Sequence, residues 1–191
     1  MDNFGFEFAR EMENGKPVVS FGKEVKLYEK AQLPEYQTKC AAGADFFAAE
    51  NVIIPSFWKS LVVILKSLSP FSYSNEYKKQ KKVLFAPTLV HTGIKAKMSD
   101  NQVLHIYNRS SNPKKLGLIL ANSVGVIDAD YYNNPDNDGE IMFAFYNVFP
   151  WDIAISSGER IGQGEFVQFL RPNIGLRVKE RDRTGGFGST N

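Results

Sequence analysis

The sequence predicts an all-β fold, and three observations lead to this prediction. Short apolar or alternating runs follow one another through most of the second half of the chain. Turn-forming residues separate the runs, for example Pro87, Gly93 and Ser99-Asp100-Asn101. The composition, with 43% hydrophobic and 23% charged residues, is that of an ordinary globular protein. Short strands with turns at this spacing are typical of a β-sandwich or barrel.

Length, charge and cysteine content narrow the functional classes. A chain of 191 residues suits one core with extra segments. The net charge of +2 does not indicate a nucleic-acid binder. Cys40 is the single cysteine, which excludes an internal disulfide and a cysteine-based zinc site, so we expect a reducing, cytoplasmic location. Met1–Arg10 lacks the pattern of a secretory signal, and no apolar run reaches the roughly 18 residues of a membrane span.

Residues 1–24 are expected to form an N-terminal arm ahead of a β domain over residues 25–178. Phenylalanine alternates with other residues in Phe4–Phe8. This alternation fits a short strand, and it equally fits an arm that packs on a neighbouring molecule. Val25–Tyr28 predicts the first strand of the domain.

The next segment predicts two strands and an insertion. Ala41–Pro55 reads as two strands joined by a turn at Glu50-Asn51. Residues 56–82 are interpreted as an insertion in the β domain. Its apolar residues fall at roughly helical spacing, but Leu61–Leu65 is also strand-like, so both alternatives stay open. The lysine cluster Lys78–Lys82 is typical of a solvated loop, the alternative being a contact with nucleic acid or an acidic surface.

Beyond the insertion, the predicted strands follow in series. They are Val83–Phe85, Leu89–Ile94, Val103–Tyr107, Leu116–Leu120, Gly125–Ile127, Ile141–Asn147 and Arg160–Phe169. The last residues, 179–191, are rich in glycine and lack a core pattern. We expect them to be mobile until something orders them.

The stretch Gly125–Tyr131 gathers polar chemistry at the end of a predicted strand. An apolar run leads into it, and Asp128 and Tyr131 then place an acid beside a flat ring. This arrangement suits a small polar substrate that contains a ring. The alternative is an ordinary turn, because Asp favours turns through hydrogen bonds to its own backbone.

Two further stretches carry groups that bind phosphate. Arg109-Ser110-Ser111 combines the planar donor fork of arginine with two hydroxyls, the alternative being a plain surface turn. Arg183 to Thr190 suits a flexible flap whose amides and hydroxyls wrap phosphates while its phenylalanine covers a base, the alternative being a disordered tail. His91 and His105 are expected in core or rim packing, and no motif supports a zinc deaminase that flips bases.

Five stretches, in this order, closely resemble the motifs of the trimeric all-β dUTPases (dUTP diphosphatases). The resemblance runs from about Val25 to Asn191 and is interrupted by the insertion. The motifs are Ala42–Phe46, Arg109–Ser111, Asn122–Tyr131, Gly158–Gln163 and Gly185–Thr190. One such match would be weak, whereas five in order on a β chain are specific.

The resemblance implies a distorted jelly-roll, or β-clip barrel, that assembles as a homotrimer with shared active sites and a flexible glycine-rich C-terminal flap. It implies hydrolysis of dUTP to dUMP and pyrophosphate by water attack on the α-phosphate, which limits uracil in DNA and supplies dUMP for dTMP synthesis. Mg²⁺ is expected to ride on the triphosphate without direct protein ligands, with Asp45 supporting it through water.

The resemblance also implies a role for individual residues. Asp128 would hold the 3′-hydroxyl and orient the attacking water as general base, and Tyr131 would pack under the sugar and exclude a 2′-hydroxyl. Asn122 and backbone groups near Gly139–Met142 would read the uracil edge. Phe187 would close over the base. The remaining implied substrate contacts, several of them to phosphates, are Arg109, Ser110, Ser111, Gly125, Ile141, Gln163, Arg183, Gly188, Ser189 and Thr190.

Three features depart from the family pattern. Ser111 stands where the second motif usually has glycine. Tyr132–Asp138 lengthens the hairpin beside the uracil site. The tail arginine lies one residue nearer the phenylalanine than in many relatives, which leaves Arg181 and Arg183 as alternatives for the terminal phosphate.

Two other functions fit parts of the sequence. dCTP deaminases share the family fold and resemble Arg109–Ser111 and Leu116–Leu118, but Ala144 stands where they carry a catalytic glutamate, and an alanine cannot relay protons. A nucleotide-gated regulatory protein is the second alternative, with residues 56–82 as its surface for a protein partner. The sequence leaves a bacterial or a phage origin open.

Overall fold

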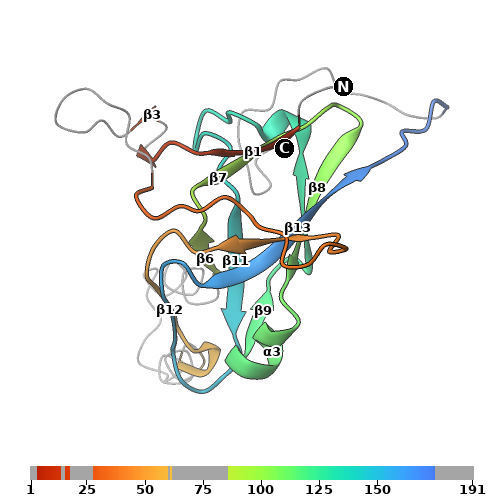
Figure 1. Cartoon of the computed structure of the whole chain (residues 1–191). Helices are drawn as coiled ribbons and strands as arrows, with labels where there is room; N and C mark the ends of the chain where they lie inside the picture. Colours follow the sequence, from red (N-terminus) through yellow and green to blue (C-terminus); the bar gives the residue numbers. More distant parts are fainter. Residues whose placement is uncertain (1–3, 14–15, 18–27, 60, 62–85, 175–191) are drawn as a thin grey trace, which may run out of the picture.

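The described part of the chain is an all-β fold with few helical residues. The computed structural model describes residues 4–13, 16–17, 28–59, 61 and 86–174 (Figure 1). The strands are β1 (Gly5–Phe8), β2 (Met12–Glu13), β3 (Lys16–Pro17), β4 (Ala44–Phe47), β5 (Val52–Ile54), β6 (Thr88–His91), β7 (Ile94–Lys97), β8 (Gln102–Asn108), β9 (Leu118–Leu120), β10 (Val124–Asp128), β11 (Met142–Asn147), β12 (Ile153–Ile155) and β13 (Arg160–Gln168). The helical elements are α3 (Ser111–Leu116) and the 3-10 turn η1 (Ala129–Tyr131).

Two larger antiparallel sheets carry the fold. One has the strand order β10-β8-β13-β4, and the other has the order β6-β11-β9. Pairs β1-β7, β12-β5 and β2-β3 complete the pairing of the described strands. In Figure 1 the β1-β7 pair lies at one end of the molecule and α3 at the other.

The core lies where inward-facing residues of both sheets meet. β8 alternates from Leu104 to Tyr107, because Leu104 and Ile106 are buried while His105 and Tyr107 are partly exposed; Val103 is buried as well. This period of two is what the sequence showed over Val103–Tyr107. The largest fully buried apolar side chains are Phe46, Phe143, Phe145, Ile54, Ile94, Leu104, Ile106, Leu118, Ile141 and Val90. Each contributes about 1.5–3 kcal/mol of burial free energy.

The structure corrects the predicted single strand over Leu89–Ile94. The chain forms two strands there, and they join different sheets: β6 pairs with β11, while β7 pairs with β1. Gly93 has a φ of 66°, in the left-handed region that glycine adopts without steric cost. The prediction joined the two segments into one strand, but the backbone turns at this glycine.

The predicted strand over Leu116–Leu120 is also shorter than expected. Leu116 ends helix α3, and the strand β9 begins at Leu118. Gly117 lies between them with a left-handed φ of 61°, a common way to end a helix. The sequence did not predict α3, nor the short strand β12 that pairs with β5.

The phenylalanine alternation near the N-terminus belongs to a strand that packs on its own chain. β1 pairs with β7 in register Gly5↔Lys97 to Phe8↔Ile94. The Phe6 ring lies edge-on to Phe46 at 5.2 Å between ring centroids and 5.0 Å from Phe166. The first part of the predicted N-terminal arm therefore contributes directly to the core.

Several predictions fall outside the described residues. They concern Val25–Leu27, the greater part of the insertion with Lys78–Lys82, the strand Val83–Phe85, and the tail from residue 175. The start of the insertion is helical at residues 57–59 and 61. Lys59 forms an ion pair of 2.7 Å with Asp152 there. In the described part of the chain, no helix has the length and apolar character needed to cross a membrane.

Candidate functional site

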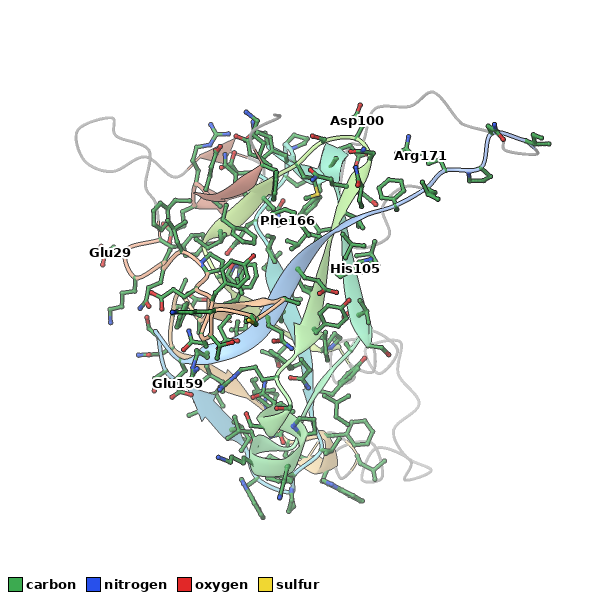
Figure 2. All side chains as sticks on the ribbon, turned by 45° about the vertical axis from the view of Figure 1, so that its right-hand side comes forward. Glu29, Asp100, His105, Glu159, Phe166 and Arg171 are labelled. Atoms are coloured by element: carbon green, nitrogen blue, oxygen red, sulfur yellow. The ribbon has the colours of Figure 1, made fainter. Side chains whose placement is uncertain are left out.

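The candidate site residues form two groups at opposite ends of the β8-β10 pair. Asp128 pairs with Val103 near the start of β8, whereas Arg109 directly follows the last residue of that strand. The six residue steps from Val103 to Arg109 correspond to about 20 Å of strand. Figure 2 shows Asp100 and Arg171 at the Asp128 end and Glu159 at the other end. One chain alone therefore does not bring Asp128 close to Arg109.

The Arg109 end joins three of the quoted stretches. Gln163 on β13 pairs with Asp45 on β4 and with Tyr107 on β8. A Cβ atom added at Gly43 would lie 3.2 Å from Gln163 Oε1, so the glutamine lies directly over this glycine. The first, second and fourth motifs are therefore neighbours within one chain.

Asn112 holds the segment with Arg109, Ser110 and Ser111 in place. It is 1% exposed, and its Nδ2 donates to Asn108 Oδ1 and to the Ile161 carbonyl, each at 2.8 Å. These bonds tie the start of α3 to both β8 and β13. Ser110 itself is exposed.

Arg160 is a residue at this end to which sequence reasoning gave no role. Its Nη1 lies 3.2 Å from Asp45 Oδ2 and 3.1 Å from Gln37 Oε1. Its carbonyl accepts a hydrogen bond of 2.9 Å from Arg109 Nη1. Arg160 therefore links the carboxylate and the arginine of the site. Its position inside Gly158–Gln163 was the available signal.

Asp128 lies at the edge of a cavity of ≈ 310 Å³ at the other end of the sheet. Its side chain is exposed where β10 ends and η1 begins. The cavity is lined by Asp100, Gln102, Asp128, Ala129, Asp130, Phe169 and Arg171. The Arg171 guanidinium stands over the Phe169 ring at 5.3 Å. A polar cavity with a carboxylate at its edge suits a hydroxylated ligand.

Tyr131, the last residue of η1, is buried rather than exposed on the surface. It is 5% exposed. Its hydroxyl accepts a hydrogen bond of 2.7 Å from Asn137 Nδ2 and lies 3.4 Å from the Glu140 carbonyl. The ring is therefore held at its polar tip by the loop that follows it.

The other residues of the third motif lie further along β10. Gly125 is buried, and a Cβ there would clash with the Ile106 side chain, which packs against this glycine. Asn122 is exposed in the turn before β10. Val124 pairs with Tyr107, so Asn122 lies toward the Arg109 end and the structure does not place it beside Asp128.

Ile141 is a core residue in this structure. Its side chain is fully buried. Its N–H donates to the Ile94 carbonyl at 2.8 Å, and its own carbonyl accepts from Thr92 Oγ1 at 2.6 Å. A contact between Ile141 and a base would have to share that carbonyl.

Two buried carboxylates follow Tyr131, and the sequence gave no role to either. Asp138 is 0% exposed and contacts Arg10 and Lys95. Glu140 is 3% exposed and lies 2.9 Å from His91 Nδ1. The two histidines expected in core or rim packing both lie on strands, His91 on β6 and His105 on β8.

Burial and nearby charges shift the pKa values of Asp138, His91 and Tyr28. Burial acts to raise the pKa of Asp138, but the hydrogen bonds from Arg10 and Lys95 outweigh it and lower this pKa overall. The hydrogen bond to Glu140 raises the pKa of His91 against the opposing effect of burial. Burial, together with the Glu140 charge, raises the pKa of Tyr28.

The described residues contain no group of three His, Cys, Asp or Glu side chains placed to hold a metal ion. Asp45 offers the hard oxygen that Mg²⁺ prefers, but it is ion-paired with Arg160. This donor set fits an ion that arrives with a triphosphate and contacts protein through water. The tail residues Arg183, Phe187, Gly188, Ser189 and Thr190 lie outside the described residues.

Comparisons with known proteins identify the family. The family model described as dUTPase matches residues 73–191. A deoxyuridine 5′-triphosphate nucleotidohydrolase of Lactococcus lactis is 42% identical over 141 residues, which cover 72% of this chain and 94% of that protein. One of Hydrogenobaculum is 31% identical over 169 residues, covering 86% of this chain and 94% of that protein.

Solved structures agree with the sequence relatives. The crystal structure of dUTPase from Streptococcus mutans is 34% identical, with a TM-score of 0.62 over 88% of this chain and 98% of that chain. A dUTPase mutant of Staphylococcus bacteriophage 80alpha, solved with dUpNHpp, has a TM-score of 0.59 at 16% identity, covering 100% of this chain and 96% of that one, and shows a similar fold. The matched model, the identities and the shared fold together mean that this chain belongs to the dUTPase family.

Proposed function

We propose that this chain hydrolyses dUTP to dUMP and pyrophosphate, as a Mg²⁺-assisted homotrimer of jelly-roll-like subunits in the cytoplasm. One observation carries the proposal: the third motif ends with Asp128 lining a polar cavity, and the Tyr131 ring three residues later is buried and held at its hydroxyl by Asn137. Family membership and the printed activity of the Lactococcus relative support the choice of substrate.

The separation of the two groups supports a site shared between subunits. Asp128 and Arg109 lie about 20 Å apart along β8, so residues of both groups meet one nucleotide only if different chains supply them. Two further features are consistent with assembly. Leu170 is 97% exposed and Ile174 is 86% exposed where the chain leaves β13, and Val124 and Val126 are exposed on β10. Contact with another copy would bury these apolar side chains.

The nucleoside is assigned to the Asp128 end. Asp128 accepts a hydrogen bond from the 3′-hydroxyl and orients a water as general base. The Tyr131 ring lies under the deoxyribose and leaves no space for a 2′-hydroxyl. Asn122 and backbone groups of the hairpin near residues 139–142 are assigned to the uracil edge by the motif alone.

The triphosphate is assigned to the Arg109 end. Arg109 supplies a planar donor fork, and Ser110, Ser111 and Gln163 add neutral donors. The flap is assigned to close over the site: Phe187 covers the base, and the remaining donors come from Arg183, Gly188, Ser189 and Thr190. Mg²⁺ bound with the triphosphate would neutralise part of its charge, and Asp45 is the residue assigned to contact its waters.

The chemical step follows from this placement. The water oriented by Asp128 gives a proton to the carboxylate as its oxygen bonds to the α-phosphorus. The bond from the α-phosphorus to the bridging oxygen breaks in line, and pyrophosphate leaves with that oxygen. Phosphoryl transfer depends mainly on positioning and charge stabilisation, which this set of residues supplies without a covalent intermediate.

The division of the chain is part of the proposal. Residues 25–178 form the dUTPase domain, 1–24 the arm, 56–82 an insertion with a surface for a possible protein partner, and 179–191 the flap. Ala144, buried on β11 and paired with Leu89, offers no group for deamination.

The deciding experiment offers dUTP, dCTP, dTTP and UTP with Mg²⁺ and identifies the products. We expect pyrophosphate and dUMP from dUTP alone. Release of ammonia from dCTP would favour the deaminase, and turnover of none of the four would refute the proposal. Sedimentation of the same preparation measures the trimer, and a monomer with full activity would contradict the shared site.

A further inference from the structure

The loop from Tyr132 to Glu140 is fastened by two buried carboxylates on either side of one glycine. Asp138 and Glu140 are 0% and 3% exposed. Gly139 between them has a φ of 78°, and a Cβ there would clash with the Tyr131 carbonyl. The backbone thus turns tightly at Gly139 and directs both carboxylates inward. We call this pair and its donors the carboxylate clamp.

Asp138 is held by two cations, Arg10 near the N-terminus and Lys95 on β7. The Arg10 backbone N–H and Nε each donate to it at 2.9 Å, and Arg10 Nη2 adds a further contact. Lys95 Nζ lies 3.1 Å from Asp138 and 2.7 Å from Asn133 Oδ1. A buried carboxylate is tolerated when it is paired and hydrogen-bonded in this way, and removing one partner is costly.

Glu140 is held by three donors on the other side of the loop. The Tyr28 hydroxyl donates to Oε2 at 2.9 Å, His91 Nδ1 lies 2.9 Å from the same oxygen, and the Gly93 N–H donates to Oε1 at 2.9 Å. The Tyr28 and His91 rings also stack at 5.6 Å. The loop is therefore fixed at both of its carboxylates by segments distant in sequence.

The clamp reaches Tyr131 through Asn137. Asn137 Nδ2 donates to the Tyr131 hydroxyl at 2.7 Å and to the Glu140 carbonyl at 3.2 Å. Its backbone carbonyl accepts from the Glu140 N–H at 3.0 Å. Asn137 stands between Tyr131 and the clamp, next to Asp138 in the chain. A shift of Asp138 would therefore move the group that holds the tip of the Tyr131 ring.

We propose that Arg10 is a positioning residue which, through Asp138 and Asn137, holds Tyr131 where its ring excludes a 2′-hydroxyl. The N-terminal strand segment would then set the preference for a deoxyribose over a ribose triphosphate. This inference rests on the proposed function, because it assigns the sugar to Tyr131. The physical reason is that a ring in contact with the sugar can exclude a single hydroxyl only while the residues around the ring hold it rigidly in place.

The test compares kcat/KM for dUTP and UTP in Arg10→Ala, Arg10→Lys and a control, Lys97→Ala. Lys97 is an exposed cation on β7, two residues after Lys95. We expect the dUTP/UTP ratio to fall about tenfold in Arg10→Ala, because a small displacement of a positioned group costs one to two orders of magnitude. Arg10→Lys should restore part of the ratio, since it keeps the charge but not the fork. Lys97→Ala should match the wild type.

Two further measurements separate positioning from general destabilisation. Amide hydrogen exchange over residues 131–141 should become faster in Arg10→Ala, and adding Asp138→Asn to that variant should lower the ratio no further. Equal losses for both nucleotides, unchanged exchange or additive effects of the two substitutions would overturn the proposal. A wild type inactive on dUTP would refute the proposed function, whereas an active wild type with an unchanged ratio in Arg10→Ala would refute the clamp alone.

Discussion

The two ends of the β8-β10 pair differ in how their polar side chains are supported. At the Tyr131 end, Asp138 and Glu140 are buried and held by Arg10, Lys95, Tyr28 and His91. At the Arg109 end the polar groups lie nearer to solvent: the Asp45 side chain is 13% exposed, against 0% for Asp138, and Ser110 is exposed. The first arrangement is fixed before a ligand arrives. The arrangement at the Arg109 end leaves its hydrogen-bond donors accessible to a ligand.

The difference fits the two separate tasks proposed for the two ends. Rejecting the 2′-hydroxyl of a ribose requires side chains that do not move, and hydrogen bonds within the protein provide that rigidity. Binding a flexible triphosphate requires several donors that a charged ligand can reach and that closure of the chain can complete. Variants at the two ends should therefore fail in different ways.

The largest effect is expected for Asp128→Asn at the nucleoside end. The amide keeps the shape of the side chain but cannot accept the proton of the water, so kcat should fall about 10³-fold. Binding of a non-hydrolysable dUTP analogue, measured by calorimetry, should persist. Asp100→Asn, which changes another carboxylate of the same cavity, should cost less than tenfold. A near wild-type kcat in Asp128→Asn would show that another group is the base.

Deleting residues 185–191 tests whether the phosphate end needs completion by the flap. We expect a folded trimer by sedimentation, with kcat/KM for dUTP lowered about 10²-fold, because the missing donors and ring act only on bound substrate. Unchanged turnover after the deletion would remove the flap from the mechanism.

Arg109→Ala should weaken the binding of dUTP and UTP to the same extent. Losing a charged donor to phosphate costs about 1.5–3 kcal/mol, which corresponds to about a 10- to 100-fold loss in kcat/KM. The dUTP/UTP ratio should stay unchanged, in contrast to variants at the Tyr131 end. Lys114→Ala, an exposed cation on α3, is the matched control. A changed dUTP/UTP ratio in Arg109→Ala would contradict the proposal that the Tyr131 end selects the sugar and the Arg109 end binds the phosphates.

The smallest effect is expected for His91→Gln, and it should depend on pH. The pKa of His91 is raised in the folded chain by its hydrogen bond to Glu140. Its stabilisation is therefore fully present below the unfolded pKa of about 6.5, and it is lost as the pH rises through the higher folded pKa. Because the side chain is 33% exposed, we expect about 0.5–1 kcal/mol.

Thermal unfolding at pH 6 and at pH 9 measures the His91 contribution. The difference in Tm between wild type and His91→Gln should be larger at the lower pH. A difference of the same size at both pH values would show that His91 acts by packing alone.

Sequence reasoning located much of the fold because strand patterns are local. The alternation of Val103–Tyr107 corresponds to β8, and Gly125–Ile127 lies within β10. It failed where one short segment serves two sheets, as in Leu89–Ile94, because the pattern alone does not show which partner strand each half pairs with. Helix α3 was missed because it is a single short element between two strands.

The sequence by itself determined the family and the identity of the candidate groups, since five short motifs in order need no knowledge of the chain path. Only the tertiary structure decided which of these groups are neighbours. It placed Asp128 and Arg109 at opposite ends of one strand pair. It also joined Arg10 to Asp138 across 128 positions. The physical reason is that a motif depends on adjacent residues, whereas a buried ion pair depends on how distant strands meet.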